Sequence, residues 1–597
     1  MRKLAAVLAV LLLHPSPSAA EKPAPDPGPP QFILTESLWN LGRFGSPLKF
    51  LRYLHDEGFT GVNLEIMDDR GGYYFYSPIL EESRWTRNPD LLDGLFRALD
   101  DPAGPFHGKP VLVSMDFSGF VRGASRRARE LSAGRIADFL EELGRNYTFT
   151  DLTSEPFSAD DHNVLFAGLG PDRKTLNIRA LYPDFEEYLY QAAFYDKSFT
   201  RAADRFITRD ASLYPPGAPS GKARSPAYPT VGFGDFLFAF GRSLDREVWA
   251  GSAGGTGLPE GSEHNLLVYR AAQYAPRGYF VLSNKGDFNI GRQTREDILR
   301  VQDRSRDHGK KPVANLVMGS GRKEMIPLPV FVEPIFNALL SAGYEVETSF
   351  RELREGADLY YIVGGKEWLD DLPFFETVLR LLDHRRSRFY GPVILHPMAE
   401  IKSAKFWKDV REHFHIPPTE RGWIRNLPAT VRERELRVRW KGALPYKGAG
   451  MTRLGAVNIR AKGGDALASE TVGGETLALI LRSGNHYLVN GNFLHLEASY
   501  FLSKMMGGAI AWPASAYVTS GRYRTAVLAA EESDVKVKIP VMEPAGSWTW
   551  RVYDAGGNLR EEKEMEGGPV FEVHLGPHEL AVLECSDYAG DAGKSRP

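Results

Sequence analysis

Cysteine is almost absent from this chain. Its 597 residues include one cysteine, Cys585. A single thiol cannot form a disulfide within the chain, and it cannot supply the paired thiolates of a cysteine-ligated zinc site. The fold must therefore be stabilised by its apolar cores, and a hydrophobic share of 43% is enough to build large ones.

The chain also lacks an excess of charge of either sign. It carries 73 lysines and arginines against 76 aspartates and glutamates, which gives a formal net charge of -3. The sequence contains no run of like charges and no basic patch with interleaved aromatic residues. Because binding to nucleic acid or to an anionic membrane surface depends on such patches, we expect neither as a partner.

Long apolar runs are missing except at the amino terminus. Two basic residues there precede an apolar stretch over residues 4–13, and small residues at 18–20 fit a cleavage site. The pattern is typical of a signal peptide over residues 1–20, because a membrane-spanning helix needs about 20 apolar residues. An uncleaved anchor is the alternative. Residues 21–30 are rich in proline and form a spacer. The sequence thus predicts export to the periplasm or the medium, without membrane insertion after cleavage.

From residue 31 to residue 309, short apolar runs alternate with amphipathic stretches. Strand–helix alternation repeated about eight times over roughly 250 residues is the pattern of a (β/α)8 TIM barrel. A doubly wound open sheet would alternate as well, but the length and the acidic residues at the strand ends favour the barrel. The predicted strands cover residues 32–36, 61–66, 109–116, 147–155, 164–169, 230–231, 247–253 and 278–283, and the predicted helices cover 47–57, 89–99, 134–143, 184–205, 233–244, 262–274 and 295–306.

A second α/β domain is predicted over residues 310–515. Its strands and helices alternate every ~20–30 residues, the spacing of a Rossmann- or flavodoxin-like fold. Residues 404–462 look like an irregular, partly β insertion. The segments 478–482 and 486–490 look like a hairpin that returns to the sheet.

The pattern changes to alternation of period two beyond residue 515. Apolar side chains recur at every second position, as in Val535, Val537 and Ile539. This spacing predicts short strands with one buried face, so residues 516–588 are expected to form a small β-sandwich. Residues 589–597 are small and polar and are expected to be a disordered tail.

Acidic residues stand at the carboxyl ends of the predicted barrel strands. Barrel enzymes place their catalytic groups there, because the loops that follow the strands form the open face. Acids from several strands would converge on one cavity, where like charges push their pKa values apart and leave one carboxyl protonated and another ionised. Glycoside hydrolysis needs such a pair. The acids are Glu36, Glu65, Asp68, Asp116, Glu155 and Asp287.

The segment Thr153-Ser154-Glu155-Pro156 resembles the Asn-Glu-Pro that ends the fourth strand in the large clan of barrel glycoside hydrolases. The resemblance implies that Glu155 is the general acid/base. Two departures accompany it: Ser154 replaces the asparagine that contacts the sugar, and residues 248–255, at the seventh strand, contain no glutamate to act as nucleophile. Asp116 or Asp287 would then be the second carboxylate, unless the barrel has lost catalysis. The alternative for Glu155 is a capping or surface carboxylate.

Aromatic side chains accompany these acids, and flat rings can stack on sugar rings. The alternative is that the aromatic residues pack within long loops, and that Glu36 and Glu65 are buried ion-pair partners at the barrel mouth. The expected substrate-binding residues are Glu36, Trp39, Glu65, Asp68, Tyr74 and Trp249.

No cofactor and no metal are predicted. Residues 160–162 read Asp-Asp-His, but acidic residues beside a histidine are common in loops. The glycine-rich stretch 251–257 lacks the lysine of a phosphate-binding loop.

The predicted middle domain resembles the class I glutamine amidotransferase fold, whose active members carry a cysteine at a strand–helix elbow. The corresponding segment, residues 395–398, reads Leu-His-Pro-Met, and Cys585 lies in the last domain. The middle domain therefore cannot perform that chemistry. The domain order resembles the β-galactosidases of glycoside hydrolase family 42, in which the middle domain builds a trimer. The resemblance implies a structural role here that would allow a homo-oligomer.

Together these features predict an exported glycoside hydrolase that acts on an oligo- or polysaccharide by carboxylate acid/base catalysis. The alternative is a catalytically inactive carbohydrate-binding protein of exopolysaccharide or envelope assembly, which the missing seventh-strand glutamate favours. A third class, an envelope protein that binds no sugar, would have a closed or apolar barrel mouth.

Overall fold

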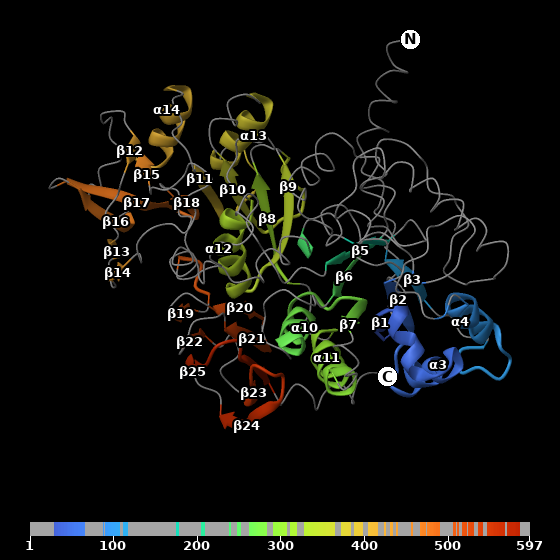
Figure 1. The fold of residues 1–597 in the computed structure, drawn as a ribbon. Helices are drawn as coiled ribbons and strands as arrows, with labels where there is room; N and C mark the ends of the chain where they lie inside the picture. The colour runs from blue at the N-terminus through green and yellow to red at the C-terminus, as the bar shows by residue number, and fades with distance from the viewer. Residues whose placement is uncertain are drawn as a thin grey trace, which may run out of the picture.

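The computed structural model describes three bodies of secondary structure (Figure 1). The described residues are 29–65, 74, 88, 90–107, 112–116, 175–177, 205–208, 238–239, 247–251, 262–282, 290–306, 311–318, 328–350, 352–364, 372–383, 387, 389–397, 404–415, 423–425, 430–433, 437–439, 455–457, 466–472, 475–489, 505–508, 510–512, 516–521, 523–529, 535–540, 546–566 and 570–585.

The first body contains a parallel sheet of seven described strands, in the spatial order β3-β2-β1-β7-β6-β5-β4. From β1 the chain steps outward through β2 to β3. It resumes at the opposite edge with β4 and steps through β5 and β6 to β7, which pairs with β1. All steps therefore run in one direction across the sheet. The strands are β1 (Gln31–Ser37), β2 (Gly61–Glu65), β3 (Leu112–Asp116), β4 (Thr175–Asn177), β5 (Arg205–Thr208), β6 (Glu247–Gly251) and β7 (Gly278–Leu282).

A one-way order is compatible with a barrel and differs from a doubly wound sheet, in which the order reverses at the middle. The residues that would join β3 to β4 lie outside the described part of the chain. So do the predicted strands at 147–155, 164–169 and 230–231. The sequence pattern predicts neither β4 nor β5. Arg205 is expected to end a helix and instead begins β5. Strands of three or four residues are too short to show a period.

Helices α2 (Leu38–Leu41), α3 (Pro47–Asp56), α4 (Leu91–Asp100), α10 (Ser262–Tyr274) and α11 (Ile290–Arg306) accompany this sheet. Helix α3 begins where the sequence predicts: the Ser46 hydroxyl accepts a hydrogen bond from the Lys49 amide at 3.3 Å, and Pro47 occupies the first turn. One face of α3 buries Phe50, Leu51 and Leu54. The helices predicted near 89–99, 262–274 and 295–306 are confirmed in type by α4, α10 and α11.

The second body contains a mixed sheet of nine described strands. Its parallel part has the order β9-β8-β10-β11-β18, which is the 2-1-3-4-5 order of flavodoxin-like sheets. Its elements are β8 (Val313–Met318), α12 (Leu328–Ser341), β9 (Glu345–Phe350), β10 (Leu359–Gly364), α13 (Leu372–Leu382), β11 (Val393–Pro397), α14 (Ala404–His413) and β18 (His486–Val489).

Antiparallel strands extend this sheet beyond β18. The predicted hairpin is confirmed, because β17 and β18 pair antiparallel around Gly484, whose φ of 59° suits a tight turn. The region 404–462 is partly β as expected, but α14 shows that it begins with a regular helix, which the sequence pattern did not predict. The strands that extend the sheet are β13 (Thr430–Glu433), β14 (Arg437–Arg439), β16 (Ala466–Val472) and β17 (Glu475–Ser483), whereas β12 (Trp423–Arg425) and β15 (Gly455–Val457) pair with each other in a separate two-stranded sheet.

The third body is a pair of antiparallel sheets, ordered β19-β22-β25 and β20-β21-β26-β23-β24, with one shared core. Side chains predicted from the period of two, such as Val537, Trp550 and Val573, meet in that core, as expected for a sandwich. Its strands are β19 (Ile510–Trp512), β20 (Ala516–Ser520), β21 (Arg524–Ala529), β22 (Val535–Pro540), β23 (Ser547–Tyr553), β24 (Leu559–Glu566), β25 (Val570–Leu575) and β26 (Leu580–Cys585).

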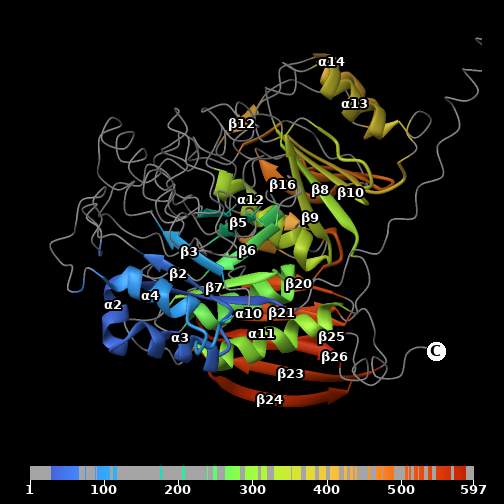
Figure 2. The same cartoon turned by 90° about the vertical axis from the view of Figure 1, so that its right-hand side faces the viewer.

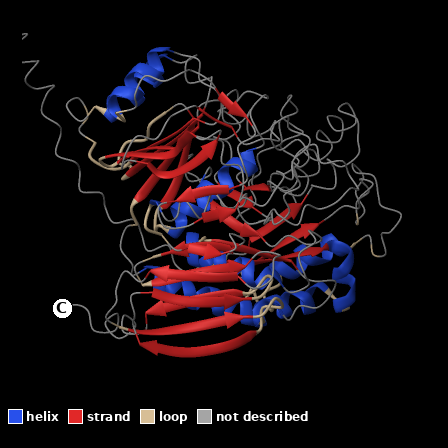
Figure 3. Ribbon diagram, turned by 90° about the vertical axis from the view of Figure 1, so that its left-hand side faces the viewer, coloured by secondary structure: helices blue, strands red, loops and turns tan. Residues whose placement is uncertain are grey.

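The five-stranded sheet of the sandwich is covered on its second face. Helices α10 and α11 lie against it (Figure 2), and α10 contacts β21. Helix α12 of the second body contacts β20. Figure 3 shows the strands of the sandwich stacked beside these helices. Because both faces are covered, every residue of β21 and of β26 is buried, so period-two alternation is lost there. Among the described helices, none combines the length and apolarity needed to cross a bilayer.

Candidate functional site

The carboxyl ends of β1, β2 and β3 lie side by side. In the parallel register Ser37 pairs with Glu65, and Glu65 pairs with Asp116. Glu65 and Asp116 each end a strand, so these two acidic positions stand at the same level of one sheet edge, on neighbouring strands about 4.8 Å apart. Glu36 lies one residue earlier on β1, level with Leu64. The structure therefore brings the positions of Glu65 and Asp116 together on one face of this edge, while Glu36, one residue out of phase, belongs to the opposite face.

Glu36 is the acid whose side chain is fixed most clearly. It is buried, and its Oε1 atom accepts hydrogen bonds from the Ser37 amide at 2.8 Å and from Asn40 Nδ2 at 2.7 Å. Asn40 lies in α2, which begins directly after β1. The tight strand-to-helix connection thus holds this carboxylate at the end of the strand. Sequence reasoning missed Asn40, although its spacing of four residues from Glu36 is that of one helical turn.

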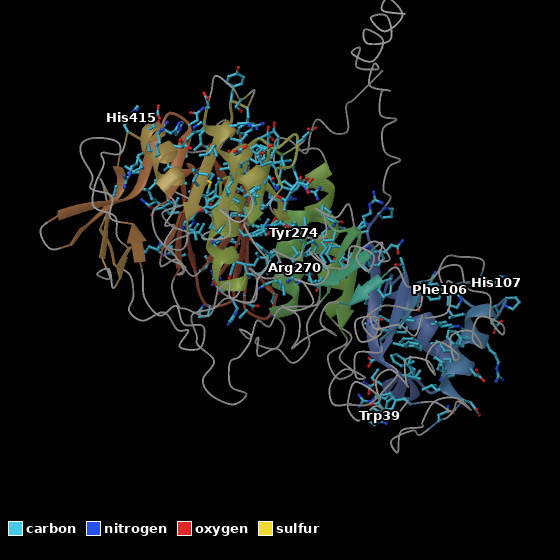
Figure 4. All side chains as sticks on the ribbon, turned by 90° about the horizontal axis from the view of Figure 1, so that it is seen from above. Trp39, Phe106, His107, Arg270, Tyr274 and His415 are labelled. Atoms are coloured by element: carbon cyan, nitrogen blue, oxygen red, sulfur yellow. The ribbon has the colours of Figure 1, made fainter. Side chains whose placement is uncertain are left out.

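Trp39 and Tyr74 are both half-buried. The Arg43 guanidinium lies 5.5 Å from the centre of the Trp39 ring, a cation–π distance. Trp39 lies in the first body, apart from Arg270 and Tyr274 of α10 (Figure 4). A partly exposed ring next to an exposed arginine is a surface on which a polar ligand with an apolar face can lie.

Trp249 lies elsewhere. Its side chain is 1% exposed, and it packs on Gly278, the first residue of β7. A Cβ atom on Gly278 would overlap the indole ring. The ring is therefore placed beside the amino end of β7, opposite to the strand ends that carry the acids. A ring with this burial has a packing role there.

For the remaining predicted site residues, the structure describes the backbone position alone or does not describe the residue. Glu65 and Asp116 are placed by the backbone of their strands. Glu155, Asp68 and Asp287 lie outside the described residues. Within the described ranges, no three His, Cys, Asp or Glu side chains gather as a metal site requires.

The elbow expected for an amidotransferase cysteine falls at the end of β11. His396 there is buried, and its Nδ1 lies 2.8 Å from the hydroxyl of Tyr361, also buried. Burial raises the pKa of Tyr361 well above its ordinary value. Cys585 is buried in the core of the sandwich. The place expected for the cysteine is thus next to a buried histidine that is hydrogen-bonded to a buried tyrosine.

A buried polar junction joins α10 and α11 to the sandwich, and sequence reasoning missed it. His264 Nε2 lies 2.9 Å from Asp297 Oδ2, and Arg300 Nη2 lies 2.8 Å from Asp297 Oδ1. Arg300 also donates to the Tyr553 hydroxyl of β23. Asn265 Nδ2 donates to the carbonyl oxygens of two sandwich turns, Asp554 at 2.7 Å and His578 at 2.9 Å. No local pattern signals partners this far apart in the sequence.

Two pKa shifts describe the electrostatics of this junction. Burial raises the pKa of Asp297, but hydrogen bonds from His264 and Gln293 and the charge of Arg300 outweigh it, so that pKa lies below its ordinary value. Burial, followed by the charge of Asp297, raises the pKa of Tyr553. Asp297 is therefore an ionised carboxylate inside the protein, while Tyr553 keeps its proton.

The sequence matches no protein-family model, and no curated protein shows significant similarity to it. Among solved structures, the α-L-fucosidase isoenzyme 2 from Paenibacillus thiaminolyticus is similar at 12% identity, with 94% of this chain and 100% of that chain covered and a TM-score of 0.46. A structure described as a glycoside hydrolase shares 10% identity, with 94% and 93% covered and a TM-score of 0.30. The rhamnosidase from Novosphingobium sp. PP1Y shares 9%, with 77% and 39% covered and a TM-score of 0.32. At these identities and TM-scores, the similarity to solved structures carries no argument about function, which is therefore argued from the residues of this chain.

Proposed function

We propose that this chain is an exported glycoside hydrolase whose first body is a (β/α)8 barrel. The one-way order of its described strands supports the barrel. An open sheet needs helices on both faces and reverses its order, whereas a barrel steps in one direction until the last strand meets the first. Here the last described strand, β7, pairs with the first. One further strand between β3 and β4 would complete eight; of the two predicted strands in that interval, 147–155 and 164–169, we assign this place to 147–155.

The placement of that strand would put Glu155 next to Asp116 around the barrel mouth. The single observation that carries the proposal is the register that sets Glu65 and Asp116 level at the carboxyl ends of neighbouring strands. Catalytic groups of barrel enzymes lie at this face. In the proposed mechanism, Glu155 protonates the leaving oxygen, and Asp116 or Asp287 attacks the anomeric carbon or activates water.

The substrate-binding part of the proposal rests on Glu36 and Trp39. A carboxylate fixed by Asn40 and by the Ser37 amide is preorganised to accept hydrogen bonds from sugar hydroxyls. The half-buried Trp39 ring offers an apolar face. Glu65, Asp68, Tyr74 and Trp249 remain proposed contacts, although the Trp249 ring is buried against Gly278.

A non-catalytic sugar-binding protein is the second candidate, and β6 favours it. With one strand between β3 and β4, β6 would be the seventh barrel strand, and it ends Trp249-Ala250-Gly251 without a carboxylate. The related clan uses a glutamate at that place as its nucleophile. Cleavage would then depend on an acid from another strand.

The decisive test compares three proteins for release of reducing sugar from a panel of bacterial and plant glycans. They are the wild type, Glu155→Gln, and Glu412→Gln as a matched control on the exposed face of α14. We expect release by the wild type and the control and a loss of ~100-fold or more in Glu155→Gln, since general acid catalysis contributes ~10²–10⁴. Binding of a glycan without release by any of the three would support the second candidate instead.

Two further parts of the proposal concern the whole chain. Cleavage of the first 20 residues and export would be tested by amino-terminal sequencing of protein recovered from the periplasm or medium. Association through the second body, with its amidotransferase-like strand order and no thiol, would be tested by the mass of the protein in solution at several concentrations.

A further inference from the structure

The junction between helices α10 and α11 and the sandwich contains a histidine whose surroundings fix its protonation. Asn265 sets the first constraint. Its Nδ2 atom donates to two backbone carbonyl oxygens, those of Asp554 and His578. The reverse orientation would place the amide oxygen against two carbonyl oxygens, so the orientation of Asn265 is fixed.

In this fixed orientation, the side-chain oxygen of Asn265, a hydrogen-bond acceptor, faces His264. Asn265 Oδ1 lies 3.0 Å from His264 Nδ1. An amide oxygen cannot donate, so Nδ1 must carry the proton that makes this hydrogen bond. Both side chains are buried, so water cannot replace the missing donor at low cost.

The other ring nitrogen also faces an acceptor. His264 Nε2 lies 2.9 Å from Asp297 Oδ2, and that oxygen accepts a second hydrogen bond from Gln293 Nε2 at 2.9 Å. Arg300 lies against Oδ1 of the same carboxylate. An ionised carboxylate with this set of donors can only accept, so Nε2 must be a donor as well.

We infer that His264 is held as a buried imidazolium, and that it makes the junction between the helices and the sandwich dependent on pH. A neutral ring has one donor and one acceptor, so loss of the proton sets one ring nitrogen against an oxygen acceptor. The stabilisation comes from two buried hydrogen bonds that only the charged ring can donate together, and one of them is lost when the ring is neutral.

The charged groups around His264 come from every element packed against it and are consistent with a cation there. Helix α11 contributes Asp297 and Arg300. The sandwich contributes Asp554, whose negative charge interacts with His264, and the neutral hydroxyl of Tyr553. The tilted ring of Tyr553 lies 5.1 Å from the imidazole, centre to centre. Beyond them, Glu584 acts on Arg300 and pairs with Arg551 at 2.8 Å.

The junction joins helices α10 and α11 of the first body to the sandwich, and we call it the latch. His264 lies in the first turn of α10, and Gly557 of the sandwich approaches so closely that a Cβ there would lie 2.6 Å from His264 Cβ. Arg524 of β21 donates to the carbonyl oxygen of Val301, one turn beyond Asp297 in α11, and to that of Ala272, near the end of α10. The hydrogen bonds around His264 therefore hold the start of α10 against α11 and the sandwich, while those of Arg524 hold the end of α10 and do not involve a histidine.

The first experiment compares thermal unfolding of the full chain from pH 6 to pH 9 in the wild type, His264→Gln and His55→Gln. His55 is the matched control, since it lies 3.5 Å from Asp56 but its side chain is 44% exposed. We expect the melting temperature of the wild type to exceed that of His264→Gln at pH 6, and the gap to shrink as the pH rises. The difference in melting temperature between the wild type and His55→Gln should be the same at every pH. A gap to His264→Gln that is the same at all pH values would overturn the inference.

A second measurement needs no variant, in case His264→Gln does not fold. Hydrogen exchange of the wild type is followed at pH 6 and pH 8.5 and corrected for the intrinsic rate. We expect protection to fall in peptides covering 262–274 and 546–558, and to hold in 393–397, which lies in the core of the second body. Unchanged protection at the junction would contradict the inference. Neither readout depends on glycosidase activity, so failure of the latch and failure of the proposed function are distinguishable.

Discussion

Trp249 and Gly278 form a contact that admits no side chain on the glycine. The buried indole of β6 lies against the first residue of β7, where a Cβ atom would overlap the ring. Because the interior is close-packed, the ring has little room to move away. This pair fixes the spacing of two neighbouring strands in the first body.

We expect Gly278→Ala to lower the free energy of unfolding by about 1–3 kcal/mol, the usual cost of overpacking a core. Gly42→Ala is the matched control, because no atom lies within 4 Å of the place a Cβ would take there and the φ of Gly42 is -57°. The control should be neutral or slightly stabilising, by up to ~1 kcal/mol. Urea unfolding measures both, and equal stabilities of the two variants would contradict this account.

Asn337 should matter more than an ordinary helical asparagine. Its Nδ2 donates to the Ala516 carbonyl at 2.9 Å, and its Oδ1 accepts from the Val518 amide at 3.0 Å. The side chain thus pairs with β20, the edge strand of the five-stranded sheet, as a neighbouring strand would. Asn337→Leu leaves two buried backbone groups without these partners, so we expect a loss of about 2–4 kcal/mol, at ~1–3 for each group with partial relaxation. Asn485→Leu, at an exposed turn, should change stability by less than ~0.5 kcal/mol.

Asp297 predicts an acid-sensitive contribution to stability. Its folded-state pKa lies below the ordinary value of 3.8, so the unfolded chain binds the proton more readily. The stabilisation is therefore present above about pH 4 and is lost as the pH falls through the lower folded-state pKa. Asp297→Asn should cost about 3–5 kcal/mol at pH 7, because it leaves buried partners without their counter-charge. The cost should shrink below pH 4.

The control for this prediction is Asp93→Asn. Asp93 and Arg97 form an exposed pair at 3.7 Å on α4, with side chains 54% and 72% exposed. Such helical pairs contribute only ~0.3–0.5 kcal/mol. Denaturant titrations of both variants at pH 3, 5 and 7 measure the difference. A cost for Asp297→Asn that does not decrease in acid would show that the carboxylate is not the group responsible.

Glu36 gives a prediction that separates binding from folding. Glu36→Gln keeps an oxygen able to accept from Asn40 and from the Ser37 amide but removes the charge. If Glu36 binds a sugar hydroxyl, the loss of a charged hydrogen bond of ~1.5–3 kcal/mol should reduce kcat/KM by about 10–100-fold. The melting temperature should change little. Glu564→Gln, on exposed β24, is the control. Unchanged kcat/KM in Glu36→Gln would remove Glu36 from the site.

Regular elements with a clear period were predictable from the sequence. Ser46 and Pro47 mark the start of α3, and Val537 and Ile539 mark the buried face of β22, because each signal is local and repeats several times. Short strands gave no such signal: β4 and β5 have three and four residues, so tertiary pairing rather than pattern defines them.

The candidate site was predictable only in outline. Acids that end strands, such as Glu65 and Asp116, can be identified in the sequence, but their equal level depends on strand register. The sequence suggested a sugar-binding role for Trp249, and its burial against Gly278 is a packing relation that no local pattern expresses. Asn40 became visible as a partner of Glu36 only once the hydrogen bond was seen.

The sequence by itself determined the single thiol, the balance of charge and the period of the longer elements, because these depend on composition and on neighbours a few residues apart. Only the tertiary structure decided the direction of steps in the first sheet and the set of hydrogen-bond partners around His264. The second result needs Asn265 to meet the Asp554 carbonyl across 289 residues of sequence. Hydrogen-bond geometry between such distant groups exists only after packing has fixed both of them.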